Sequence, residues 1–210
     1  MNTVSWVRRI PIHTQGRTGS CTGHTLAGIL GTDSTGRKGS TSVSVTADPF
    51  GVFTAGRYPL DELFAVRAYS LATRLDNISG DYPRTDTGSN GLGAAKAATA
   101  LGLLADYAHV RSLDALKDAL QSGPVMWGTF WYQSMFRVDR RGFLNVDKSS
   151  RRLGGHELII SGYSPERDYF TIQNSWGPRW AVKGFAFVSG ADMAWLLSQY
   201  ADITVPVFPR

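Results

Sequence analysis

Apolar residues in the first half of the chain recur every three or four positions, a spacing typical of amphipathic helices. In residues 59–75, PLDELFAVRAYSLATRL, one predicted helical face carries Leu60, Leu63, Phe64, Leu71 and Leu75. Ser20 is a suitable N-cap for a helix over residues 21–30, and Gly31 can end that helix. Further helices are predicted over residues 91–102, 112–124 and 191–200. The Gly-, Ser-, Thr- and Pro-rich residues 31–59 are predicted to be loop with one short strand over residues 40–45.

After Pro124 the pattern changes to short runs of β-branched and aromatic residues bounded by turn residues, which is typical of strands. The predicted strands cover residues 124–131, 142–146, 156–163, 169–176 and 184–188. Helices followed by an antiparallel sheet make an α+β layout of two lobes, and ligands commonly bind in a cleft between lobes. No repeat or linker divides the chain, so we expect a single domain over residues 1–210.

The composition narrows the class of protein. The chain has 210 residues, of which 42% are hydrophobic, and this suits one globular domain with a sizeable core. It holds no run of 18 apolar residues and no N-terminal apolar signal, so we expect a cytoplasmic protein or one released without a signal peptide. The net charge is +5, but the basic residues are scattered, and we expect no nucleic-acid or membrane partner.

Cys21 is the only cysteine, so the fold has no internal disulfide. A lone cysteine is usually a buried small apolar residue. Cys21, however, lies on the first turn of a predicted helix, where the helix dipole is expected to lower the thiol pKa and favour the nucleophilic thiolate.

A cysteine nucleophile needs a base, usually histidine, and a group that orients the base. His156 begins a predicted strand after two glycines, where a ligand can approach closely. Asn174 follows on the next strand of a predicted hairpin, where its side-chain oxygen could accept a hydrogen bond from the imidazole. Cys21, His156 and Asn174 therefore form a candidate nucleophile, base and orienting group.

Together, Gln15, the Gly19–Ser20–Cys21 run, the Gly155–His156 strand and the Asn174–Ser175–Trp176–Gly177 motif resemble the papain-like cysteine peptidases. The resemblance extends from about residue 11 to about residue 200. It implies a papain-like two-lobed fold, with a helical lobe over about 11–108 and a β-barrel-like lobe over about 109–205. It also implies a member lacking a pro-region and disulfides, of a bacterial or phage type.

The resemblance implies a role for each of these residues. Cys21 would attack the peptide carbonyl, His156 would share a proton with the thiol, and Asn174 would orient His156. The Gln15 side-chain amide and the Cys21 backbone N–H would form the oxyanion hole.

The resemblance also implies substrate-binding residues. The segment Gly88–Gly91 would run beside the substrate, Trp176 would shield the His–Asn hydrogen bond, and Trp180 would line the far side of the leaving-group subsites. The expected substrate-binding residues are Gly88, Ser89, Asn90, Gly91, Gly155, Trp176 and Trp180. Specificity would depend mainly on the pocket for the second residue before the cut, and the sequence does not indicate what forms its floor.

Several positions depart from the family pattern. Gly23 and His24 replace an Ala–aromatic pair, Ala181 replaces a glycine, and Leu92 stands near a position that is often glycine. We expect His24 to be packed in the core, and His13 and His109 to lie on the surface.

Two other candidate sites are disfavoured. A metal site of Cys21, His24 and His156 lacks the spacing of known metal motifs, so we expect neither a metal nor another cofactor. Glu157 lies on the opposite face of its strand from His156 and is not expected to be the base.

The leading interpretation is thiol-dependent hydrolysis of peptide bonds in proteins or peptides, through an acyl-enzyme and by a monomer. One alternative is a hydrolase of cell-wall cross-links or isopeptide bonds with the same site. The other is a catalytically silent peptide-binding module, which the changes at Gly23, His24 and Leu92 motivate.

Overall fold

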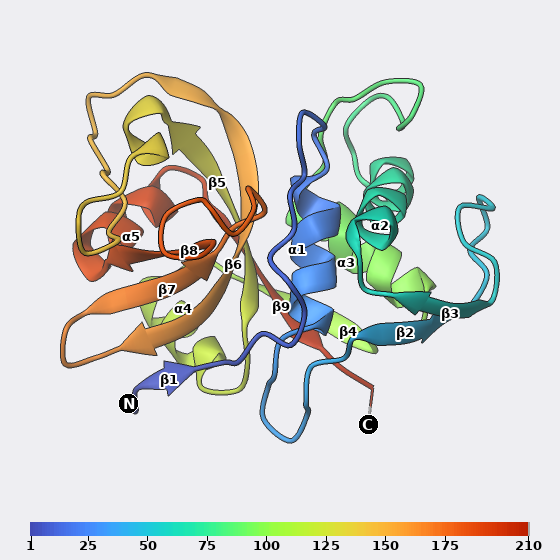
Figure 1. Ribbon diagram of the computed structural model, residues 1–210, viewed down its shortest axis with the longest axis horizontal. Helices are drawn as coiled ribbons and strands as arrows, with labels where there is room; N and C mark the ends of the chain where they lie inside the picture. Colours follow the sequence, from blue (N-terminus) through green and yellow to red (C-terminus); the bar gives the residue numbers. More distant parts are fainter. Residues whose placement is uncertain (210) are drawn as a thin grey trace.

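The computed structural model describes residues 1–209 and shows two lobes side by side (Figure 1). One lobe is mainly helical and the other is built on an antiparallel sheet. The helices are α1 (Cys21–Leu30), α2 (Glu62–Leu75), α3 (Gly91–Ala100), α4 (Leu113–Leu120) and α5 (Gly190–Ser198). No helix among the described residues is long and apolar enough to cross a membrane.

The sheet lobe has seven antiparallel strands, whose main path runs in the order β4-β9-β5-β6-β7-β8, while β1 pairs with β6. The strands are β1 (Val4–Ser5), β4 (Asp106–Val110), β5 (Val125–Tyr132), β6 (Arg152–Ser164), β7 (Tyr169–Gln173), β8 (Phe185–Ser189) and β9 (Asp202–Val207). A separate hairpin of β2 (Ser42–Val45) and β3 (Gly56–Pro59) belongs to the helical lobe. The α+β two-lobed fold predicted from the sequence is therefore confirmed.

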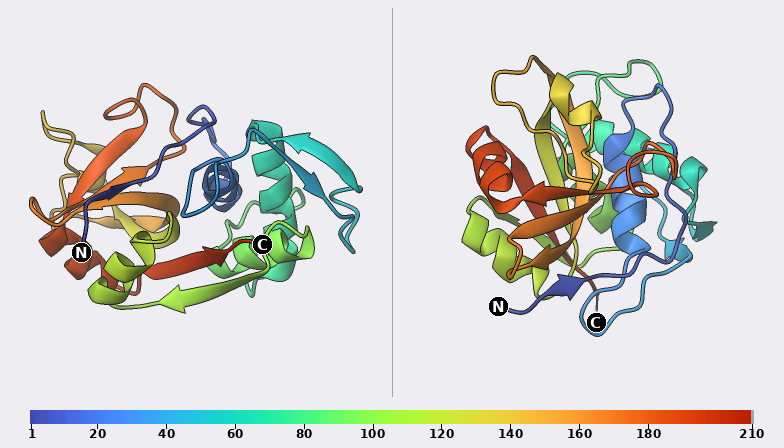
Figure 2. Two further views of the ribbon diagram at one scale, coloured as in Figure 1. Left: turned by 90° about the horizontal axis from the view of Figure 1, so that it is seen from below. Right: turned by 60° about the vertical axis from the view of Figure 1, so that its left-hand side comes forward.

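Helix α1 lies where the lobes meet. It packs against α2 on one side and against β6 on the other, and the views in Figure 2 show it between the sheet and the helical lobe. All ten of its residues are buried, which follows from a sequence with no charged side chain. One core of the molecule joins α1 to α2 and α3, and another fills the sheet lobe around Trp127 and Phe170.

Side chains cap the N-termini of four helices. Asp61, Asn90, Ser112 and Ser189 each accept a hydrogen bond from a backbone N–H of the helix that follows. Ser20 occupies the N-cap position of α1 as predicted, but its side chain makes no capping hydrogen bond.

Four expectations about the elements are wrong. Residues 142–146 form only isolated bridges, at Phe143 and Leu144, because these residues belong to a loop that crosses the edge of the sheet. The strands β1, β3, β4 and β9 were not predicted, since β1 has only two residues and polar residues or proline interrupt the apolar pattern of the others. Leu63 lies on the exposed side of α2 and not on its core face. His13 is 4% exposed and not a surface residue, because it packs against the ring of His24 in the core.

Candidate active site

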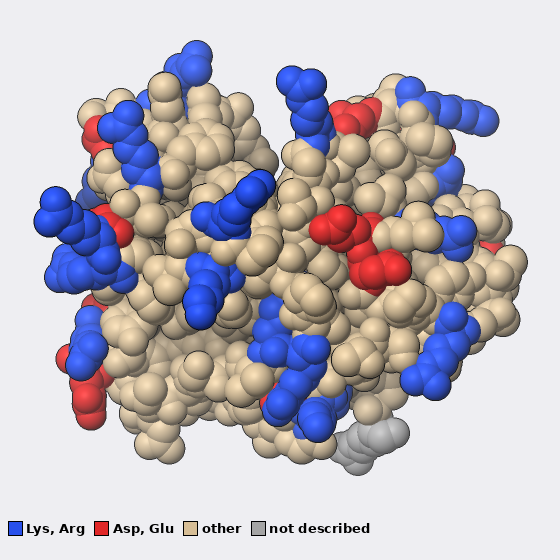
Figure 3. All heavy atoms as spheres, in the orientation of Figure 1, with Lys and Arg blue, Asp and Glu red and all other residues tan. Residues whose placement is uncertain are grey.

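A cleft with a volume of about 560 Å³ opens where the lobes meet. Figure 3 shows the molecular surface notched between the lobes, with Lys and Arg scattered over this face. Cys21 lines the cleft from the helical lobe, and His156 lines it from the sheet lobe. The cleft therefore brings together the predicted nucleophile and base, which lie 135 positions apart in the sequence (156 − 21).

Cys21 is the first residue of α1 and is 8% exposed. The hydroxyl that could cap this helix is engaged elsewhere, since Ser20 Oγ lies 2.6 Å from Thr18 Oγ1. Without a side-chain cap, the backbone N–H groups of the first turn stay available to a ligand in the cleft. The helix end is thus suited to receive developing negative charge beside the thiol.

The thiol itself is not pre-ionised in this geometry. Burial, followed by the charge of Glu157, raises the pKa of the Cys21 thiol to about 12. The pKa of the Cys21 thiol is therefore raised and not lowered as expected from the helix dipole, because burial disfavours the thiolate. A second group must accept the proton if the thiol is to react.

His156 on β6 is oriented to be that group. Its Nε2 atom lies 2.8 Å from Asn174 Oδ1, which also accepts a hydrogen bond of 2.8 Å from the Ser175 backbone N–H. An oxygen acceptor at this position requires a proton on Nε2, so the neutral ring carries its lone pair on Nδ1. Burial lowers the pKa of His156 to about 4, so the free ring is neutral and able to act as a base.

Aromatic side chains cover the His156 ring. Trp176 stacks on it with ring centres 4.8 Å apart, and Trp131 meets its edge at 5.1 Å. Phe136 stacks on the outer side of Trp176 at 5.1 Å. These rings exclude water from the histidine, which accounts for its burial. Trp180 meets the edge of Trp176 at 5.6 Å, and neither tryptophan is among the residues that line the cleft.

Gln15 lines the cleft beside Cys21, and its amide is fixed at both ends. Ser175 Oγ donates to Gln15 Oε1 over 2.6 Å, and Gln15 Nε2 donates to the Thr18 carbonyl over 3.0 Å. One amide hydrogen of Nε2 remains for another acceptor. Ser175 thus links the Gln15 side to the Asn174 side of the site.

The segment expected to bind substrate backbone forms the wall of the cleft on the helical side. Gly88, Ser89 and Asn90 line the cleft, whereas Gly91 already begins α3. Gly88 has a φ of +76°, a conformation that favours glycine. Gly155, on the opposite wall, faces open space.

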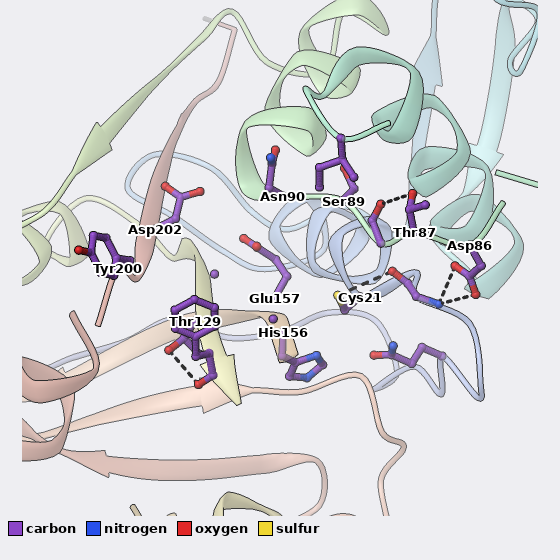
Figure 4. Close-up of a pocket in the computed structure, with 17 residues that line it drawn as sticks. Cys21, Asp86, Thr87, Ser89, Asn90, Thr129, His156, Glu157, Tyr200 and Asp202 are labelled. Atoms are coloured by element: carbon purple, nitrogen blue, oxygen red, sulfur yellow. Dashed lines mark hydrogen bonds between the residues drawn. The ribbon is translucent and has the colours of Figure 1, made fainter. Parts of the chain in front are cut away.

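Glu157 also lines the cleft, although its place in the sequence did not indicate this. Alternation along β6 does direct it away from His156, as predicted, but that side also belongs to the cleft (Figure 4). Its side chain is 4% exposed, and the Oε1 atom has no hydrogen-bond partner among the described residues. A charged residue in a buried stretch of an otherwise apolar strand was the sequence signal that could have found it.

His24 is buried behind the site, as expected. Its Nδ1 lies 3.2 Å from His13 Nδ1, and burial lowers its pKa to about 3. The two rings are neutral neighbours in the core and do not line the cleft. Among residues 1–209, no group of three or more His, Cys, Asp or Glu is placed to hold a metal ion.

Comparison with known proteins shows to which protein family the chain is related. The sequence model of a family described as "Papain family cysteine protease" matches residues 67–199. This range includes His156 and Asn174 and begins after Cys21. Silicatein of Petrosia ficiformis is 34% identical over 48% of this chain, and cathepsin Q of Rattus norvegicus is 33% identical over 35%. An uncharacterized peptidase C1-like protein of Acanthamoeba polyphaga mimivirus is 28% identical over 43%. The matches cover 29%, 23% and 33% of these relatives, so the chain matches a third of their length or less.

Solved structures share the fold over nearly the whole chain. Xylellain, a cysteine protease from Xylella fastidiosa, aligns with a TM-score of 0.62 at 19% identity and covers 100% of this chain and 87% of its own. The Carica candamarcensis cysteine protease in complex with E-64 aligns with a TM-score of 0.52 at 19% identity, over 98% of this chain and 99% of its own. The papain-like arrangement of the two lobes is therefore confirmed. The family match over most of the chain and the fold lead to one conclusion: the chain belongs to the papain family of cysteine proteases.

Proposed function

We propose that this chain is a thiol-dependent peptidase that uses Cys21, His156 and Asn174. The observation that carries the proposal is the 2.8 Å contact of His156 Nε2 with Asn174 Oδ1, in a cleft that Cys21 lines from the other lobe. That contact leaves the Nδ1 lone pair of His156 for the thiol proton. Without such a base, the buried thiol would stay protonated at neutral pH.

The chemistry begins with transfer of the Cys21 proton to His156 Nδ1. Burial disfavours either charge alone, but a thiolate and an imidazolium that form together attract each other in a site of low dielectric constant. The sulfur attacks the peptide carbonyl, and His156 returns the proton to the leaving amine. Water, deprotonated by His156, then cleaves the thioester and restores the thiol.

The carbonyl oxygen gains negative charge during both steps. The uncapped first turn of α1 supplies the Cys21 backbone N–H, and Gln15 Nε2 supplies a side-chain donor. Donors fixed in this way before the reaction stabilise the oxyanion without reorganising. The Ser175 hydrogen bond holds the Gln15 amide in a set orientation.

The departures at Gly23 and His24 have packing reasons and give no support to a silent binding module, whereas nothing in the structure explains the half-buried Leu92. A side-chain carbon at Gly23 would lie 1.9 Å from the Ala65 carbonyl oxygen on α2, so the close approach of the two helices requires glycine. His24 fills the core beside His13. Ala181 has a φ of +46°, a conformation that glycine adopts without strain, and it lies outside the cleft lining.

Hydrolysis of a diverse peptide mixture, read by mass spectrometry, tests the proposal. We expect cleavage that requires a reducing agent, is abolished in Cys21→Ser and falls by at least about 100-fold in His156→Ala. Glu166→Gln, which changes an exposed residue outside the cleft, is the control. Peptide binding without cleavage by the wild type, with equal affinity in Cys21→Ser, would instead favour the silent module.

A further inference from the structure

The cleft is acidic although the protein is basic. The chain has a net charge of +5, yet the residues that line the cleft include Asp86, Glu157 and Asp202 and no Lys or Arg. Asp86 is engaged in the fold, since it accepts hydrogen bonds from the Gly19 backbone N–H at 3.0 Å and the Tyr69 hydroxyl at 2.6 Å. Glu157 and Asp202 are the carboxylates left to face the cleft.

Three neighbouring strands place these two carboxylates side by side. Gly128 on β5 pairs with Glu157 on β6 and with Asp202 on β9, so all three residues lie in one row across the sheet. Direct cross-strand partners point to the same face. Figure 4 shows the Glu157 carboxylate directed toward Asp202 and Asn90, away from His156.

Glycines make room for the carboxylates. A side-chain carbon at Gly128 would lie 2.8 Å from Glu157 Oε2. One at Gly91 would lie 2.7 Å from Thr204 Oγ1, 2.9 Å from Asp202 Oδ2 and 3.1 Å from Glu157 Oε1. Any larger residue at either position would displace an acidic group. The two glycines thus keep open a space that Glu157 and Asp202 line.

Glu157 is the unsatisfied member of the pair. It is 4% exposed, and its Oε1 atom has no hydrogen-bond partner within residues 1–209. Asp202 has a partner on its outer side, His109 Nδ1 at 3.2 Å. Burial and the neighbouring Asp202 raise the pKa of Glu157 well above its usual range, so this carboxyl group holds a proton while the cleft is free. A cation with several N–H donors would replace that proton and stabilise the carboxylate.

Gly91 also places the acidic group relative to substrate. It ends the segment Gly88–Gly91 proposed to run along the substrate backbone, and a side-chain carbon at Gly91 would lie 3.1 Å from Glu157 Oε1. A side chain that leaves the substrate backbone beside this segment and points into the cleft would reach the carboxylates. The scissile carbonyl would lie next to Cys21, one residue further along.

We propose that Glu157 and Asp202 form a subsite for a cationic side chain, arginine or lysine, on the second substrate residue before the cut. The proposal rests on the peptidase function proposed above and names its substrate class. The guanidinium group, with five donors in a planar fork, suits two adjacent carboxylates best.

The test compares matched substrates with a blocked amino terminus. Acetylated dipeptides with a fluorogenic leaving group would carry arginine or citrulline, its neutral isostere, at the second position before the cut. We expect kcat/KM to be at least about tenfold higher for arginine than for citrulline, as for a charge-assisted hydrogen bond in a buried site. In Glu157→Gln the ratio of kcat/KM for arginine to kcat/KM for citrulline should approach one. In Asp202→Asn the same ratio should lie between one and the wild-type value.

The ratio cancels any general loss of activity in a variant. Glu166→Gln, which removes one exposed negative charge outside the cleft, should keep the wild-type ratio. Equal rates for arginine and citrulline in the wild type would overturn the subsite. So would a preference for a free α-amine over the acetylated form regardless of the side chain, because the carboxylates would then bind an amino terminus. No hydrolysis of any substrate would count against the peptidase function itself, not the subsite alone.

Discussion

Single residues in this site are held in place before a substrate arrives. Gln15 is the clearest case, because Ser175 Oγ fixes its oxygen at 2.6 Å and the Thr18 carbonyl fixes its nitrogen at 3.0 Å. A donor that needs no reorganisation stabilises an oxyanion more than a mobile one. The role of Gln15 should therefore show only in reactions that create an oxyanion.

Gln15→Ala separates these reactions. We expect kcat for peptide hydrolysis to fall by about 100- to 1000-fold, the usual loss for one oxyanion donor. Alkylation of Cys21 by iodoacetamide builds no oxyanion, so its rate should change by no more than about twofold. A parallel loss in both rates would show that Gln15 supports the thiol and not the oxyanion.

The sequence was sufficient to predict that Cys21 and His156 meet in the cleft, but not which other residues line it or the electrostatics of the site. Cys21, His156 and Asn174 could be named from motif and order, and the cleft holds Cys21 and His156 together. The raised thiol pKa depends on burial and on Glu157, which is a property of tertiary packing. The alternation of residues along β6 predicted correctly that Glu157 points away from His156. The sequence pattern did not predict β9, however, and without β9 it could not show that this face of β6 also lines the cleft.

At the scale of elements, α1 sets the position of the nucleophile. It contacts α2 so closely that a side-chain carbon at Gly23 would lie 1.9 Å from the Ala65 carbonyl oxygen and 2.7 Å from the Tyr69 backbone nitrogen. Both are backbone atoms of α2, which cannot rotate away. The helix pair must separate to accept any larger residue.

Gly23→Ala should therefore destabilise the fold. We expect the free energy of unfolding, measured by urea denaturation, to fall by at least about 2 kcal/mol, in the upper part of the range for overpacked cores. Gly56→Ala is the matched control, because the nearest atom would be a side-chain carbon of Tyr58 at an ordinary 3.8 Å. An equal, small effect of both substitutions would mean that α1 and α2 are less tightly packed than described.

Elements with strong local signals were predicted best. Helix α1 begins and ends where its cap residues indicated, at Cys21 and Leu30. Strand β9 was missed because its sequence, DITVPV, contains a proline and gains its partners only from distant β4 and β5. Pairing between residues so far apart leaves little trace in local periodicity.

For the whole molecule, buried histidines make stability depend on pH. Burial lowers the pKa of His24 to about 3 and of His156 to about 4, and it also lowers the pKa of His13. The unfolded chain therefore binds more protons at these residues below about pH 6.5, and stability falls as the pH falls. Glu157 acts in the opposite direction, because burial and Asp202 raise its pKa well above the usual range.

Three buried histidines lower the stability at acid pH, and only Glu157 has the opposite effect, so the net effect is a loss of stability as the pH falls. Urea denaturation at pH 7, 6 and 5 should show the free energy of unfolding falling by about 1 kcal/mol or more per pH unit in the acid range. His24→Gln removes one group that binds a proton only in the unfolded chain. The change in the free energy of unfolding with pH should therefore become smaller by up to about 1.4 kcal/mol per pH unit. A slope that is zero in the wild type, or unchanged in His24→Gln, would contradict the buried neutral state of His24.

The central claim is that His156 activates the buried thiol of Cys21 within a substrate-shaped cleft. The most direct test is labelling by an epoxysuccinyl inhibitor at pH 7, read by intact mass and peptide mapping, in the wild type, Cys21→Ala and His156→Ala. We predict one adduct on Cys21, none in Cys21→Ala, and labelling at least about 100-fold slower in His156→Ala, because the thiol pKa of about 12 leaves little thiolate without the base. Absence of labelling in the wild type, or an equal rate in His156→Ala, would contradict the account.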